Sequence, residues 1–445
     1  MVQKWFLLVG CAVAAFGAQP LQKIFPYAYS QEDLPNGLRL VTVPTDYANI
    51  VATFIVVQTG SRNEVEPGRT GFAHLFEHLM FRGTAKIPSE KYNQTLNRIG
   101  AASNASTSRD YTVYYTTFSK EDLDTVLMME ADRFQGLKYA EPEFKTETLA
   151  VLGEYNKNSA SPFNKLNEVL YDTAFDRHTY KHTTMGFLKD IQDMPNQYEY
   201  SMKFFDRYYR PEYTTIIVVG DVKTKGVREI VDKYWGAWKR GNYRPEIAME
   251  PAQDVPRDNH VAWTSATLPI VTVAFKGPAY NDNTKDSAAL DALAYLAFSQ
   301  NSDLYQKLVV REQKADALQG DAPGNVDPSL FEITARVKKA EDLNYVRDCI
   351  LETVKGFQEQ PVDAARLDAV RKRLRYQVAL SMDNSETIAR ILAFYVSLRR
   401  SPDTINKLYD QYAGLTPEDV RQAAAKYLVE KSRTIVTLTG PGGAR

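Results

Sequence analysis

Two histidines and one glutamate in residues 71–80 have the types and the spacing of a metal site. The segment reads GFAHLFEHLM and contains His74, Glu77 and His78. On a helix, His78 lies about 40° to one side of His74 and Glu77 about 60° to the other. Zinc prefers imidazole and carboxylate ligands, and a catalytic zinc site keeps one position for water. We therefore predict that both histidines bind one ion and that Glu77 lies beside it as a general base. The alternative is two partly exposed histidines on an amphipathic helix.

The remaining residues of this segment predict the helix that holds these side chains in place. Thr70 is the expected N-cap. On the opposite side of the helix fall five large apolar residues: Phe72, Leu75, Phe76, Leu79 and Met80. One side of the helix is thus expected to pack into a core while the other presents the histidines.

A third metal ligand must come from another segment, and residues 142–158 contain two candidates. Pro142 suits the first turn of a helix, on which Glu147 and Glu154 lie two turns apart on one face. One carboxylate can bind the metal while the other orients a histidine. The alternative is a solvated acidic face. His178 and His182 lack a carboxylate at metal spacing and are interpreted as loop residues.

The chain divides near its middle, which indicates two units that position the site. Residues 241–258 contain three prolines and no sustained apolar period, so they are the expected linker. Each half opens with strand-like sequence, at residues 38–59 and 260–276. Each closes on a β-branched run that ends in glycine, at residues 207–220 and 426–440. These similar ends favour an internal duplication of two α/β or α+β units.

The N-terminus has the pattern of an export signal. Lys4 precedes an apolar run at residues 5–16 and small residues at 15–18. We predict a signal peptide at residues 1–18, a mature chain that begins near Gln19 and export to the bacterial periplasm. The run is too short to span a membrane. Lipid anchoring at Cys11 is the alternative.

Composition excludes other classes and leaves a globular protein. The 445 residues carry a formal net charge of −1, which gives no electrostatic footprint for nucleic acid. Of the two cysteines, Cys349 lies among apolar residues and is expected to be a small buried side chain.

Three segments resemble the pitrilysin-type zinc metallopeptidases (M16), the family that includes mitochondrial processing peptidase. They are GSRNE at residues 60–64, GFAHLFEHLMFRGT at 71–84 and GAASNASTSRDYTVYY at 100–115. The resemblance is specific in the first half and looser in the second. It implies an α+β fold with two homologous metallopeptidase-like α/β sandwich domains, residues 26–240 and 259–445. Each would have a mostly antiparallel sheet with helices, and two such chains would face each other around a chamber.

By position, the resemblance implies a role for each candidate residue. His74, His78 and Glu154 would bind one zinc ion, Glu77 would be the general base and Glu147 would support a ligand. The family's edge strand would pair with the backbone of a peptide substrate, here through residues Asn104, Ala105, Ser106 and Thr107.

The second half departs from the family, whose active members carry an Arg and a Tyr that hold the substrate carbonyl. The ungapped alignment places Val309 and Asp316 at those positions, and a shift of two recovers Arg311 but places Leu318 at the Tyr. We therefore predict a zinc metalloendopeptidase subunit whose Arg and Tyr come from a homologous partner in a heterodimer. The alternatives are a self-sufficient homodimeric peptidase and a noncatalytic zinc-binding assembly subunit.

Overall fold

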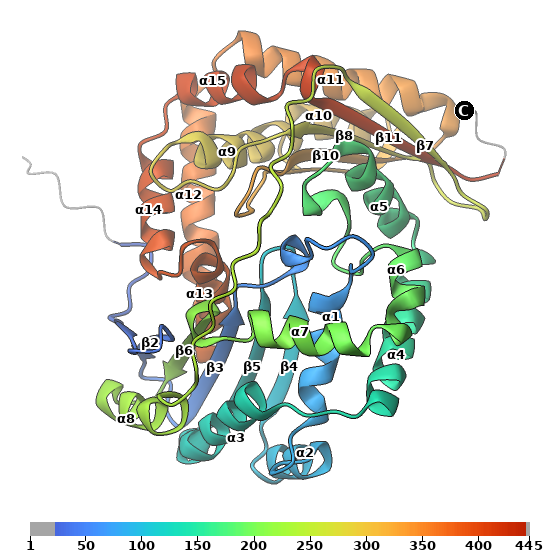
Figure 1. Cartoon of the computed structure of the whole chain (residues 1–445). Helices are drawn as coiled ribbons and strands as arrows, with labels where there is room; N and C mark the ends of the chain where they lie inside the picture. Colours follow the sequence, from blue (N-terminus) through green and yellow to red (C-terminus); the bar gives the residue numbers. More distant parts are fainter. Residues whose placement is uncertain (1–22, 442–445) are drawn as a thin grey trace, which may run out of the picture.

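Two β-sheets, one in each half of the chain, organise the structure (Figure 1). The structure is a computed structural model that describes residues 23–441. The predicted signal peptide, the start near Gln19 and the alternative anchor at Cys11 lie outside the described residues. Among the helices of residues 23–441, none is long and apolar enough to cross a membrane.

The first half forms a six-stranded sheet in the order β1-β2-β6-β3-β5-β4. Its strands are β1 Ser30–Asp33, β2 Arg39–Pro44, β3 Ile50–Val57, β4 Ala102–Thr107, β5 Thr112–Ser119 and β6 Thr214–Gly220. Its helices are α1 Phe72–Leu79, α2 Ser89–Arg98, α3 Leu123–Gly136, α4 Glu141–Ser159, α5 Pro162–Ala174, α6 Leu188–Asp193, α7 Tyr198–Tyr208 and α8 Thr224–Trp235.

The second half forms a five-stranded sheet in the order β7-β11-β8-β10-β9. Its strands are β7 Arg257–Ala262, β8 Ile270–Lys276, β9 Ala315–Asp321, β10 Leu330–Val337 and β11 Arg433–Thr439. Its helices are α9 Asp286–Phe298, α10 Asp303–Tyr305, α11 Leu343–Glu359, α12 Ala364–Ser381, α13 Ser385–Arg399, α14 Asp403–Ala413 and α15 Pro417–Tyr427. A π-helical segment, Gln306–Arg311, follows α10.

The two sheets repeat one topology. In each, the only parallel pair joins an early strand to the last strand, β2 to β6 and β7 to β11, and the other neighbours are antiparallel. β4 and β9 are the corresponding edge strands. The predicted fold class, two homologous α/β units with mostly antiparallel sheets, is confirmed.

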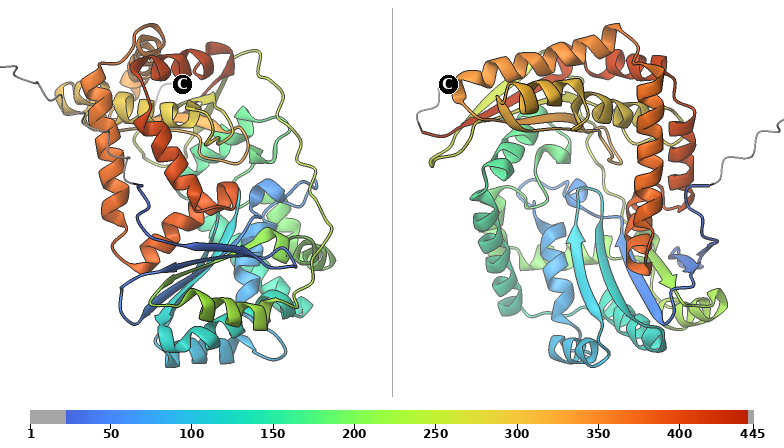
Figure 2. Two further views of the ribbon diagram at one scale, coloured as in Figure 1. Left: turned by 90° about the vertical axis from the view of Figure 1, so that its left-hand side faces the viewer. Right: turned by 180° about the vertical axis from the view of Figure 1, so that it is seen from behind.

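Helices of the second half complete the core of the first. Successive residues of a strand point to opposite faces, and Val51 and Ile55 of β3 pack with the helices of the first half. Ala52 and Phe54 belong instead to the core that contains the second half's helices, and α13 crosses β3 and β6 (Figures 1 and 2). The apolar run of β3 therefore reflects burial on both faces.

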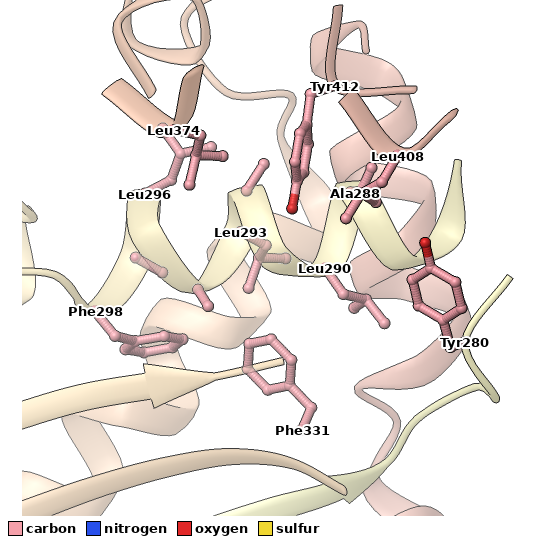
Figure 3. Close-up of a cluster of buried hydrophobic side chains, with 14 of the residues drawn as sticks. Tyr280, Ala288, Leu290, Leu293, Leu296, Phe298, Phe331, Leu374, Leu408 and Tyr412 are labelled. Atoms are coloured by element: carbon pink, nitrogen blue, oxygen red, sulfur yellow. The ribbon is translucent and has the colours of Figure 1, made fainter. Parts of the chain in front are cut away.

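α9 is apolar on almost every side because other elements surround it. Leu290 and Phe298 point toward the sheet and Phe331, while Leu296 faces Leu374 of α12 (Figure 3). Cys349 of α11 is a free thiol, 6% exposed, which confirms the expected small buried side chain.

The connection between the halves, residues 236–256, contains no helix or strand, and β7 begins within the expected linker of residues 241–258. The boundaries predicted for the domains, residues 26–240 and 259–445, stay a prediction, since the two sheets share one core.

Candidate metal centre

The start of α1 differs from the sequence-based expectation. Thr70 is not the N-cap; its hydroxyl donates instead to Asp190 Oδ2 at 2.7 Å. Gly71 is the N-cap, with a left-handed φ of 90°. The carboxylate of Glu64 accepts hydrogen bonds from the backbone N–H groups of Gly71, at 2.8 Å, and Ala73, at 2.7 Å. A residue outside the helix therefore satisfies the donors that its first turn leaves free.

The two sides of α1 are divided as its periodicity predicts. The five apolar residues expected on one side are fully buried and pack in the core of the first half: Phe72, Leu75, Phe76, Leu79 and Met80. The histidines point the other way, toward α4, which packs against α1.

Three side chains from α1 and α4 converge on one point. Oε2 of Glu154 lies 3.4 Å from Nε2 of His74 and 3.5 Å from Nε2 of His78. Potential ligand atoms of these three residues all lie within 4.8 Å of one another, and this is the one such group found in residues 23–441. One ion can therefore be reached by two imidazoles and one carboxylate, the donor types that zinc prefers. Three protein ligands would leave a fourth position for water.

Glu147 lies on the other side of His78. Its Oε2 is 3.3 Å from Nδ1 of His78, the ring nitrogen that faces away from Glu154. Its other oxygen accepts from the guanidinium of Arg82. A carboxylate in this position fixes the tautomer and orientation of a metal-binding histidine. The arrangement separates the two candidates: Glu154 faces both imidazoles and Glu147 faces one.

The charges of the metal-free site follow from these contacts. The hydrogen bond from His74 lowers the pKa of Glu154 to about 2. The hydrogen bond with His78 lowers the pKa of Glu147, and the same contact raises the pKa of His78. Both glutamates are therefore ionised at neutral pH, as a metal ligand and its supporting carboxylate must be.

Glu77 lies beside the histidines and contacts the neighbouring strand. Its Oε2 accepts a 2.6 Å hydrogen bond from the hydroxyl of Thr107, the last residue of β4. A cavity of about 370 Å³ is lined by Glu77 and Thr107 together with His74, Glu154 and Ser106. The candidate base, two candidate ligands and the end of β4 thus open into one space.

β4 has one free edge. Within residues 23–441 it pairs with β5 alone, in a register that places Asn104 opposite Tyr115 and Thr107 opposite Thr112. Along the strand, Asn104 and Ser106 are exposed, while Ala105 is buried. A backbone edge of this kind can accept another strand.

The second half supplies no Arg and Tyr at the positions matched by sequence. Val309 packs against the shared core and Leu318 is buried in it. Asp316 accepts a 2.7 Å hydrogen bond from Arg336, and Arg311 is exposed. Neither alignment places a tyrosine hydroxyl here, and the missing pair stays a prediction from the sequence.

An arginine and two tyrosines do meet near this region, from other elements. A cavity of about 510 Å³ is lined by Tyr295, Tyr305 and Arg373, together with Asp316 and Leu318. The guanidinium carbon of Arg373 lies 5.9 Å from the ring centre of Tyr295. Sequence spacing could not find this group, because α9, α10 and α12 contribute one residue each.

Two further residues of the site were not assigned a role from the sequence: Glu64 and Arg82. Glu64 lies in the GSRNE segment and is fully buried, and burial raises its pKa to about 8. A lone acidic residue before a helix is a weak signal, since most such residues are exposed.

His178 lies in a loop, as expected, and its Nε2 is 2.9 Å from Asp327 of the second half. His260 lies on β7, as expected.

Comparison with known proteins agrees with this fold. The H-x-x-E-H order of His74, Glu77 and His78 is the signature of one class of zinc metallopeptidases, the inverzincins. The insulinase family (peptidase family M16) matches residues 39–187, and the peptidase M16 inactive domain matches residues 197–374. The chain belongs to peptidase family M16.

Its relatives are similar along most of the chain. The zinc protease PqqE of Helicobacter pylori is 30% identical over 414 residues, which cover 91% of each protein. A probable mitochondrial-processing peptidase subunit beta of Arabidopsis thaliana is 26% identical, over 92% of this chain and 77% of that protein. The crystal structure of a protease from Helicobacter pylori superimposes with a TM-score of 0.86 at 29% identity, covering 93% and 99% of the two chains.

Proposed function

We propose that this chain is the zinc-binding subunit of an exported metalloendopeptidase that hydrolyses unstructured peptides. One observation carries the proposal. Nε2 of His74, Nε2 of His78 and Oε2 of Glu154 converge beside Glu77, at the end of the free-edged strand β4. The relatives named zinc protease add support for the metal and for the reaction class.

The donor set fits one zinc ion per chain. His74, His78 and Glu154 would hold it, and Glu147 would orient His78 through Nδ1. When bound, zinc supplies a Lewis acid that lowers the pKa of a coordinated water to about 7.

Glu77 is the proposed general base. Its carboxylate accepts from Thr107 and opens into the cavity that the ligands line. From there it can take a proton from the attacking water and deliver it to the leaving amine. The hydroxyl of Thr107 holds the carboxylate in this orientation.

The substrate is proposed to bind as an added strand on β4. Backbone hydrogen bonds from residues 104–107 would hold an extended peptide, and such bonds do not depend on the peptide's sequence. Asn104 and Ser106 point to the exposed side, while Ala105 anchors the strand in the core. A peptide paired there would pass beside Glu77, because Thr107 at the end of β4 contacts that residue.

The oxyanion donor is proposed to come from a partner chain that carries the Arg and the Tyr. Loss of one oxyanion donor typically costs about 10²- to 10³-fold in rate, and Asp316, already paired with Arg336, would repel the developing charge. One relative is named as a subunit, which supports a paired assembly.

A self-sufficient homodimer is the second candidate, favoured by the cavity that Tyr295, Tyr305 and Arg373 line. In such a dimer, these residues of one copy would supply donors to the zinc site of the other. A noncatalytic zinc-binding assembly subunit is a weaker alternative, since such a subunit has no need of Glu77 in addition to the ligand set. The N-terminal pattern of residues 1–18 supports export to the periplasm.

Glu77→Gln tests the reaction. We expect this variant to keep its zinc and to lose peptidase activity by about 10²- to 10⁴-fold, because only proton transfer is removed. Glu141→Gln, an exposed carboxylate at the start of α4, is the matched control. Cleavage of a flexible peptide is measured with the assembled enzyme, and zinc by metal analysis. Normal cleavage by Glu77→Gln would mean that another residue is the base.

A further inference from the structure

The carboxylate of Glu64 lies beneath the first turn of the helix that carries both histidines. Its side chain has no exposed surface. Oε2 accepts from the N–H of Gly71 at 2.8 Å, and Oε1 accepts from the N–H of Ala73 at 2.7 Å. Ala73 is the residue before His74, so these two bonds fix the backbone that carries the first candidate ligand.

The surrounding loop leaves this turn little room to move. A Cβ on Gly71 would lie 2.8 Å from the carbonyl oxygen of Met185, and one on Gly186 would lie 2.7 Å from the nitrogen of Gly71. Nδ1 of His182 lies 3.7 Å from Glu64 Oε2 and 2.9 Å from the carbonyl oxygen of Thr183. Met185 and Thr183 also line the cavity at the metal centre. Glu64 thus lies where the helix and one wall of the cavity meet.

The two histidines are supported in different ways. Nδ1 of His78 contacts Glu147, which holds the ring. Nδ1 of His74 is buried and has no hydrogen-bond partner among the described residues 23–441. A metal-binding histidine is usually held by a hydrogen bond to its second nitrogen. His74 lacks that support here, so its position depends on the backbone of the first turn.

We propose that Glu64 is a positioning residue for the metal centre. Through the backbone of α1, it holds His74 in register with His78 and Glu154. The inference rests on the proposed zinc site and adds a residue that contacts neither the metal nor the substrate. In Glu64→Gln the amide keeps one acceptor oxygen but turns an NH2 donor toward the other buried N–H group, which loses its acceptor, so the first turn must shift to relieve this. His78, one turn later, keeps its contact with Glu147.

The test compares Glu64→Gln with Glu130→Gln, each freed of metal by a chelator. Glu130 is an equally buried carboxylate of the first half, but it pairs with Arg133 and Tyr92 on α3 and α2. Zinc affinity is measured by competition with a chromophoric chelator, and ligand geometry by the visible spectrum of the cobalt-substituted protein. Thermal unfolding reports stability separately.

We expect zinc binding to weaken about 10- to 100-fold in Glu64→Gln, with a changed cobalt spectrum. Glu130→Gln should lower the unfolding temperature and leave both metal readouts as in the unmodified chain. Glu64→Asp keeps a carboxylate for folding but is too short to reach both N–H groups, so an intermediate loss is expected. Unchanged zinc affinity and cobalt spectra in both Glu64 variants would overturn the proposal. If the unmodified chain binds no zinc, the proposed metal centre itself is wrong.

Discussion

The position of Glu154 between the two imidazoles leads to a quantitative prediction about zinc affinity. Glu154→Gln replaces a carboxylate that both Nε2 atoms face at 3.4 and 3.5 Å with a neutral amide, which is a poor zinc ligand. Glu147→Gln removes a carboxylate that faces only Nδ1 of His78. The two substitutions are chemically identical and lie on the same helix, so their difference reports position alone.

The expected sizes follow from these roles. Four-ligand zinc sites bind with about 10–16 kcal/mol, or about 3 kcal/mol per ligand, so loss of Glu154 should weaken binding at least ~100-fold. Loss of a carboxylate that only orients a histidine typically costs about 10- to 100-fold. Glu154→Gln should therefore bind zinc more weakly than Glu147→Gln, and both more weakly than the unmodified chain.

The assay is a competition titration of metal-free protein against a chromophoric zinc chelator. Glu141→Gln serves as the control, because its carboxylate lies on α4 but pairs with Lys145 at the surface. Circular dichroism verifies that each variant is folded. If Glu154→Gln binds zinc as tightly as the unmodified chain, Glu154 is not a ligand. A larger loss in Glu147→Gln than in Glu154→Gln would exchange the two roles.

The other predictions concern acid stability, partnership and export. Burial lowers the pKa of His182 from 6.5 to about 4. As the pH falls from about 6.5 to about 4, His182 is therefore protonated in the unfolded chain but not in the folded one, and the metal-free protein loses stability. Between pH 7 and about pH 4.5, the free energy of unfolding should fall by about 2 kcal/mol less in His182→Gln than in the unmodified chain, as measured by urea unfolding. An equal fall in both proteins would contradict this prediction. The isolated chain should bind zinc yet cleave a flexible peptide poorly until a homologous chain with Arg and Tyr is added. Robust turnover alone, abolished in Arg373→Ala, would favour the homodimer. N-terminal sequencing of secreted material should find a start near Gln19, and a lipid-modified Cys11 would replace this with an anchored protein.

Local patterns in the sequence indicated two duplicated α/β or α+β units and one side of the site, while the family resemblance supplied the mostly antiparallel sandwich of each unit. The spacing of His74, Glu77 and His78 and the apolar residues opposite them depend only on the period of one helix. Helical period relates residues a few positions apart, so it can be read without knowledge of the rest of the chain. The same holds for the strands β3 and β6, whose β-branched runs predict strands before any pairing is known.

Only the tertiary structure decided how the separate segments meet. Periodicity places Glu147 and Glu154 on one face of α4, but the packing of α4 on α1 determines which of them faces both imidazoles. The cap of α1 is a further case: Thr70 has the right type and position, yet Glu64 takes the role because the chain folds back beneath the turn. Likewise, α13 covers the second face of a sheet formed by residues far earlier in the sequence. These contacts join residues that are far apart in the sequence. Their geometry depends on how the cores pack, and the spacing of nearby residues does not determine that packing.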